Sequence, residues 1–79
     1  MPETGMNIME FKLRGEFVAL CDLLKLTGIA DSGGQGKRMI ANGEVSVDGQ
    51  PESRKTAKIR ANQIVQCLGQ RVRVVAAES

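Results

Sequence analysis

The chain has 79 residues, enough for one small domain with a thin core and little room for a deep catalytic cleft. It has no histidine, and its two cysteines, Cys21 and Cys67, lie 46 residues apart, so metal-ligand spacing is absent and we expect reduced thiols in a cytoplasmic protein. The net charge is only +2, but residues 25–73 carry nine basic and four acidic side chains, which suggests an anionic partner. No apolar run is long enough to span a bilayer, and we expect no signal peptide.

The first predicted elements are a strand and a helix. Apolar and charged residues alternate over residues 9–14, the period of a half-buried strand. Apolar residues then recur at i, i+3, i+4 and i+7 between Phe17 and Leu24, which predicts a helix that Gly15-Glu16 opens and Gly28 ends. In this interpretation both phenylalanines, Phe11 and Phe17, face the core.

A second helix is predicted over residues 33–41. Ser32 lies three residues before Gln35, the spacing of a capping box at a helix start, and Gly43 closes the helix. Three glycines weaken this helix by about 1 kcal/mol each where they fall in its interior, so tertiary packing must hold it. Small residues there would also let another backbone, or a phosphate, approach closely.

Strands and turns fill the rest of the chain. Residues 44–49 alternate and end in Asp-Gly, a strong hairpin signal. Residues 51–58 are polar and basic and predict a loop or an irregular strand, whereas 64–67 and 71–74 predict two further strands. We therefore expect an α+β fold with two helices packed on one side of a small, mainly antiparallel sheet.

The run SGGQGKR invites comparison with a phosphate-binding P-loop, but the match fails. Asp31 stands where the first glycine is needed, Arg38 replaces the hydroxyl residue that would hold magnesium, and a helix precedes the loop. Histidine and tyrosine are absent from the chain, and Cys21 lies on an apolar stripe where a thiol is inert packing. We predict no enzyme, no catalytic residue, no metal, no cofactor and no small-molecule substrate.

Two groups of basic residues favour nucleic-acid binding. Lys37 and Arg38 lie near the start of the second helix, where the backbone amides also favour anions. A second group lies past the hairpin and comprises Arg54, Lys55, Lys58 and Arg60. Such groups contact phosphates rather than bases, and a stacking surface is not expected because both phenylalanines face the core. A folded or helical RNA is the partner that this pattern predicts.

The run LCDLLKLTGIADSGGQGKRMIANGEVSVDG resembles the RNA-binding domain named for the small-subunit ribosomal protein S4. That family shows an L-x-x-L helix, then G-[LI]-A-x-S, a basic helix ending I-x-x-G, and V-x-V-[ND]-G. The positions that match in register are Leu20, Leu24, Gly28, Ile29, Ala30, Ser32, Ile40, Gly43, Val45, Val47, Asp48 and Gly49. The resemblance implies an S4-like domain with an αL motif over residues 1–79, a core motif over about 17–67, and flexible ends at 1–7 and 76–79.

The resemblance also implies a function and a site. It points to a small stand-alone bacterial RNA-binding protein, monomeric, whose partner is a structured RNA such as ribosomal or transfer RNA. Transferred by position, the RNA-binding residues are Lys37 and Arg38 on the second helix, Arg54, Lys55 and Lys58 on the loop, and as further candidates Arg60 and Lys25. The alternative is a protein-interaction adaptor whose basic face docks an acidic partner, for example on the ribosome.

Overall fold

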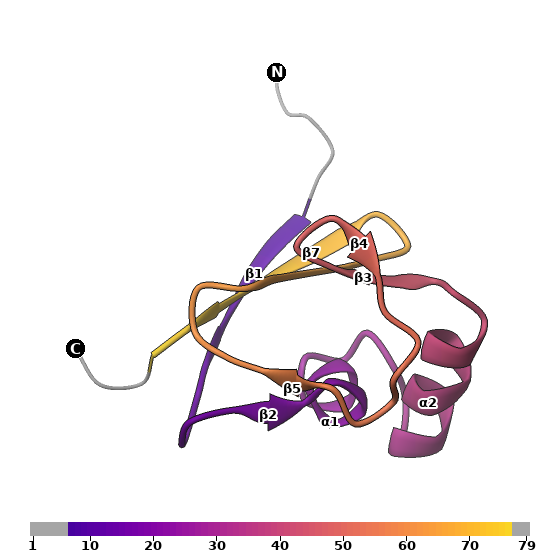
Figure 1. Cartoon of the computed structure of the whole chain (residues 1–79), viewed down its shortest axis with the longest axis horizontal. Helices are drawn as coiled ribbons and strands as arrows, with labels where there is room; N and C mark the ends of the chain where they lie inside the picture. Colours follow the sequence, from indigo (N-terminus) through magenta and orange to yellow (C-terminus); the bar gives the residue numbers. More distant parts are fainter. Residues whose placement is uncertain (1–6, 77–79) are drawn as a thin grey trace.

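A small sheet covers two helices in the computed structural model of the protein, which describes residues 7–76 (Figure 1). The elements in chain order are β1 (Asn7–Lys12), β2 (Val18–Ala19), α1 (Leu20–Leu26), α2 (Gly33–Ala41), β3 (Val45–Val47), β4 (Gln50–Pro51), β5 (Lys58–Ile59), β6 (Ile64–Cys67) and β7 (Gln70–Val75). The ends that the sequence predicts to be flexible lie almost wholly outside the described residues, although Asn7 already belongs to β1. Neither described helix is long and apolar enough to cross a membrane.

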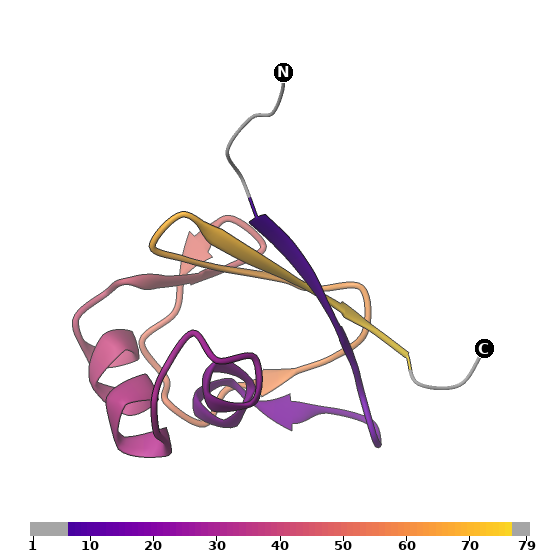
Figure 2. The same ribbon diagram turned by 180° about the vertical axis from the view of Figure 1, so that it is seen from behind.

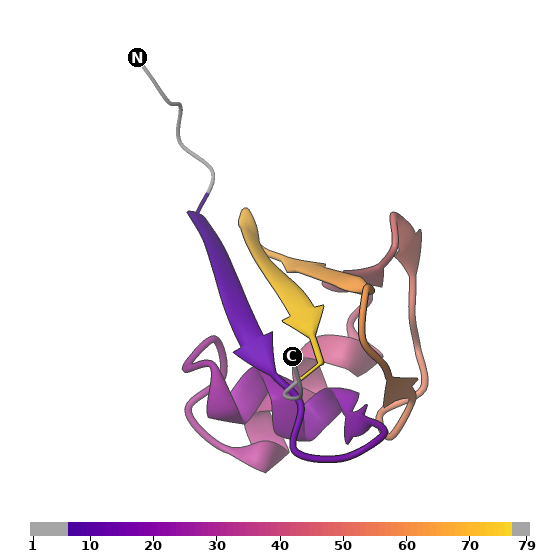
Figure 3. The same ribbon diagram turned by 90° about the vertical axis from the view of Figure 1, so that its left-hand side faces the viewer.

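The main sheet has five strands in the order β1-β7-β6-β3-β4. β1 runs parallel to β7, while the β7–β6, β6–β3 and β3–β4 ladders are antiparallel. In Figure 2, β1 lies in front of β7 and runs from the upper part of the molecule to its lower right, and Figure 3 shows the two strands side by side. β2 and β5 form a separate two-stranded antiparallel ribbon. The predicted α+β class with a mainly antiparallel sheet is confirmed, with one parallel ladder at its edge.

The core lies between the sheet and the helices, which occupy one side of it (Figure 3). Alternation along β7 explains this layering, because Val72 and Val74 are fully buried while Arg73 is exposed. The fully buried side chains come from both layers: Leu20, Leu23, Leu24, Ile40, Val45, Ile59, Val65, Cys67, Val72 and Val74. Both cysteines are free thiols within this core.

The second helix and the hairpin occur where the sequence predicts them. The Ser32 hydroxyl caps α2 by accepting the backbone N–H of Gln35 at 3.1 Å, and the Gln35 side chain accepts the N–H of Asp31 in return. At the hairpin, Asp48 and Gly49 have φ of 53° and 86°, the left-handed values that a two-residue turn requires. These signals are local, so they predict the structure without long-range information.

The start of the first helix differs from the prediction. Helix α1 begins at Leu20, because Val18 and Ala19 are taken up by β2, where Val18 pairs with Ile59. Phe17 therefore lies before the ribbon and not on a helix, and it is 44% exposed. The prediction that Phe17 faces the core is wrong, whereas Phe11 does pack against the core.

Candidate nucleic-acid interface

The basic loop over residues 52–57 is fixed to the first turn of α1 by its backbone. Ala19, the residue before the helix, makes no side-chain cap. Instead, the backbone N–H of Leu20 donates to the carbonyl of Ala57 at 2.9 Å, and the N–H of Cys21 donates to the carbonyl of Lys55 at 3.1 Å. Loop carbonyls thus satisfy amides that a helix start leaves without partners, and the loop side chains remain free to face solvent.

Helix α2 packs against the same turn of α1. A Cβ added at Gly36 would lie 3.0 Å from the Cys21 carbonyl oxygen and 3.6 Å from the Leu24 Cβ. The glycine-rich sequence of α2 therefore serves helix packing at Gly36, and its next two residues, Lys37 and Arg38, are exposed. Because the backbone of Cys21 contacts both α2 and the loop, the two predicted basic segments flank one turn of α1 (Figure 1).

Arg54 is held within its own loop by an acidic residue. Its Nε and its backbone N–H both donate to the Glu52 carboxylate, at 3.1 and 3.0 Å. The Arg54 side-chain hydrogen bond lowers the pKa of Glu52 and, in return, the pKa of Arg54 is raised. This is the one ion pair found within residues 7–76, so the other predicted cations keep no acidic partner there.

The loop and the ribbon together form a shallow basic surface. Arg54, Thr56, Ala57 and Lys58 line an open hollow of about 400 Å³. Lys58 also lies over the ring of Phe17, with its Nζ 5.1 Å from the ring centroid. The guanidinium of Arg60 lies 5.9 Å from the same centroid. The ring of Phe17, which the sequence predicts to face the core, thus lies beside both Lys58 and Arg60 at the end of the loop.

Lys25 stands apart from this cluster. It is exposed in the last turn of α1, whereas the loop is bound to the first turn. Lys25 lies four positions after Cys21 in the sequence, about 6 Å along the helix axis. Its positive charge also interacts favourably with the carbonyls at the C-terminal end of the helix. This is an ordinary structural role for a basic residue in a last turn.

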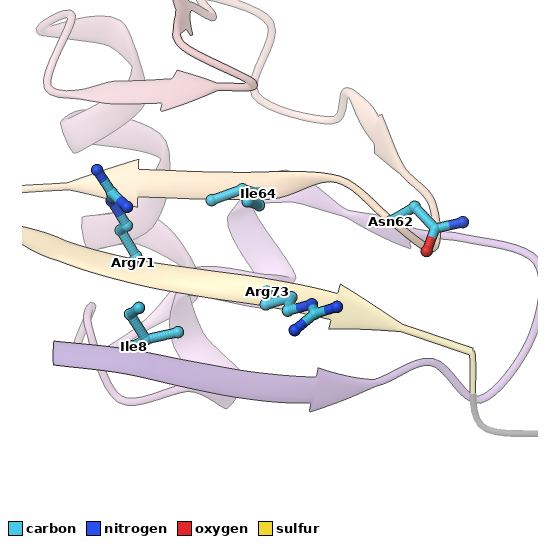
Figure 4. A pocket seen from close by; sticks show the side chains of 5 residues that line it. All are labelled: Ile8, Asn62, Ile64, Arg71 and Arg73. Atoms are coloured by element: carbon cyan, nitrogen blue, oxygen red, sulfur yellow. The ribbon is translucent and has the colours of Figure 1, made fainter.

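Two further arginines face the opposite side of the molecule. On β7, Arg71 and Arg73 alternate with the buried valines and lie on the outer face of the sheet (Figure 4). With Ile8, Asn62 and Ile64 they line a hollow of about 330 Å³. The Nε of Arg71 is buried and has no hydrogen-bond partner among the described atoms. Part of the positive charge counted in residues 25–73 therefore does not belong to the loop surface.

Sequence reasoning missed Phe17 as a surface residue near these cations. Its helical spacing with Leu20 and Leu24 is real, but it is produced by a short strand followed directly by a helix. A usable signal was the valine at position 18, a β-branched residue at the start of the predicted helix.

Comparison with known protein families identifies this small α+β domain as an S4 domain. Residues 11–75 match the S4 domain, and the chain belongs to that family. A similar protein is YbcJ of Escherichia coli (strain K12), named as a candidate RNA-binding protein. It is 56% identical over 59 residues, covering 75% of this chain and 84% of YbcJ. YbcJ of Shigella flexneri matches with the same identity and coverage.

Solved structures agree with this assignment. The solution structure of E. coli YbcJ, described as revealing an αL motif involved in RNA binding, superposes with a TM-score of 0.72. It is 48% identical and covers 96% of this chain and 98% of that one. The 30S ribosomal protein S4e from Thermoplasma acidophilum has a TM-score of 0.56 and 26% identity, over 73% of this chain and 31% of that one. The expected family and fold are confirmed.

Proposed function

We propose that this chain is a non-enzymatic RNA-binding protein that contacts the phosphates of a structured RNA with side chains from α2, from the loop over residues 52–57 and from the adjoining residues Lys58 and Arg60. The observation that carries the proposal is the backbone of Cys21, which contacts both α2 and the loop, so two basic segments that are far apart in the sequence pack against the same turn of α1. Membership of the S4 domain family and the RNA-binding description of the YbcJ structure support it.

The proposed contacts come from Lys37 and Arg38 on α2 and from Arg54, Lys55, Lys58 and Arg60 beyond the hairpin. All six are exposed side chains. Long flexible cations on a surface bind phosphates without reading bases, so recognition would follow the shape of the RNA. We further propose a monomeric cytoplasmic protein whose partner is a ribosomal or transfer RNA, with Lys25 as a peripheral contact at most.

Salt dependence tests the proposal. If about four phosphates are neutralised, the slope of log affinity against log salt should be near −3 to −4, at roughly 0.7–0.9 per contact. The double variant Lys37→Ala, Arg38→Ala should flatten this slope and weaken binding to every structured RNA in a panel. Parent-like affinity in that variant would exclude α2 from the interface.

A charge-matched control separates local contacts from net charge. The double variant Arg71→Ala, Arg73→Ala removes the same two positive charges, but from the outer face of the sheet. It should bind RNA with nearly the affinity and salt slope of the parent. Equal losses in both double variants would show that overall charge, and not the α2 and loop surface, drives binding.

The second candidate function is a protein adaptor that docks an acidic partner. The outer face of the sheet favours it, because Arg71 has a buried Nε without a partner beside the exposed Ile8 and Ile64. Co-purified material discriminates the two functions. A 260/280 nm absorbance ratio that falls after nuclease treatment supports RNA, and it is a sensitive readout because the chain has no Trp or Tyr. A co-eluting acidic protein lost from the Arg71→Ala, Arg73→Ala variant supports the adaptor.

A further inference from the structure

Phe17 is an aromatic side chain at the edge of the basic surface rather than in the core. It is 44% exposed, and it directly precedes β2, whose partner β5 carries the exposed Lys58. Burial alternates along this part of the chain, with Ala57 and Ile59 inside and Lys58 and Arg60 outside. The ring thus shares the outward face of the ribbon with two cations.

The cation–π contacts of the Phe17 ring with Lys58 and Arg60 are weak enough for a nucleobase to replace them. Lys58 Nζ lies 5.1 Å from the ring centroid, and Arg60 Cζ lies 5.9 Å from it. A cation over an exposed ring contributes only about 2- to 5-fold to an equilibrium, whereas stacking of a nucleobase on an aromatic side chain contributes about 5- to 150-fold. A base can therefore take the ring while the cations turn to its phosphates.

We propose that Phe17 is a stacking platform for one unpaired base of the bound RNA, with Lys58 and Arg60 holding the phosphates on either side of that nucleotide. The inference rests on the proposed RNA-binding function and makes it more specific. It assigns as preferred partner a helical RNA interrupted by an unpaired nucleotide. Lys58 also lines the hollow beside Arg54, so the stacked nucleotide lies next to the phosphate-contacting loop.

Composition makes the assignment unusually clear. The chain has two phenylalanines and no Trp or Tyr. Phe11 packs against the core, so within the described residues Phe17 is the one aromatic side chain open to a base. A sheet platform with several stacked bases, as in other RNA-binding folds, is excluded by this count.

The test compares two RNAs of the same sequence, a short duplex and the same duplex with a single-nucleotide bulge. The parent should prefer the bulged RNA by about 5-fold or more, and Phe17→Ala should lose that preference while it binds the plain duplex as before. Phe17→Trp should keep the preference. Because it introduces the sole indole of the chain, its fluorescence should be quenched by the bulged RNA and not by the plain duplex.

Ile8→Trp is the matched spectral control. Ile8 is 61% exposed on the outer face of the sheet, so an indole there should not respond to either RNA. Far-UV circular dichroism and thermal melting establish that each variant is folded, which the exposure of the two positions favours.

Each remaining outcome is decisive. A Phe17→Ala variant with the same ratio of affinities as the parent overturns the inference and leaves phosphate binding intact. An equal loss on both RNAs also overturns it, because the ring would then only hold Lys58 and Arg60 in place. Failure of the parent to bind either RNA with a salt slope is the failure of the proposed function itself.

Discussion

Replacing Gly36 with alanine tests the helix contact on which the position of the α2 cations depends. The added Cβ would meet the carbonyl oxygen of Cys21 at 3.0 Å, tighter than nine in ten real Cβ contacts. That oxygen belongs to the α1 backbone, so the two helices must move apart by a few tenths of an ångström. Such overpacking costs about 1–3 kcal/mol, while alanine gains back about 1 kcal/mol of helix propensity. We expect a net loss of about 1 kcal/mol, a fall in Tm of about 4–8 °C.

Gly34 provides the control on the same helix. A Cβ there has one neighbour within 4 Å, the Ser32 Oγ at 3.9 Å, so Gly34→Ala adds the same methyl group without a clash. It should stabilise the protein by up to about 1 kcal/mol, which places the two variants about 2 kcal/mol apart. Urea unfolding followed by far-UV circular dichroism measures this difference, since the chain lacks tryptophan. A Gly36→Ala variant as stable as Gly34→Ala would refute the close approach of α1 and α2.

Two further predictions concern the helix cap and the loop ion pair. Ser32→Ala removes the acceptor of the Gln35 N–H and should cost about 1 kcal/mol in urea unfolding; an unchanged midpoint would mean that solvent satisfies this N–H equally well. The pKa of Glu52 is lowered from its usual 4.5, first by the Arg54 side-chain hydrogen bond, so Arg54→Ala should raise it in an NMR titration of the side-chain carboxyl. Because the folded pKa lies below the unfolded one, the stabilisation from this pair is present above about pH 4.5 and is lost as the pH falls through the folded pKa. An identical Glu52 titration in parent and variant would show that the ion pair does not persist in solution.

Local signals account for the parts of the fold that the sequence predicts. The Ser32 and Gln35 spacing places the start of α2, and the Asp48-Gly49 turn places the hairpin, because each depends on hydrogen bonds or φ values within a few residues. The short alternating runs predict the strands of β6 and β7 for the same reason. None of these features needs knowledge of a distant partner.

Long-range pairing explains the parts that the sequence does not predict. Val18 leaves the predicted helix because it pairs with Ile59, 41 residues later, and this pairing moves Phe17 to the surface. The parallel partner of β1 is likewise β7, at the other end of the chain. The sequence predicts every cation of the candidate site. It does not predict that Glu52 forms an ion pair with Arg54.

The way the loop is attached determines how the proposed interface should respond to substitution. Its anchor points are the carbonyls of Lys55 and Ala57, which every residue type supplies, so changing the exposed side chains leaves the loop in place. The same carbonyls occupy the first amides of α1, which removes that helix start as a phosphate site and leaves side chains to provide the contacts. Phosphate contacts of this kind are individually replaceable, so single alanine variants at Arg54 or Lys58 should each lose little affinity. Phe17 has no second aromatic side chain beside it that could replace it. Its alanine variant should therefore lose the preference for the bulged RNA, whereas the single cation variants should not.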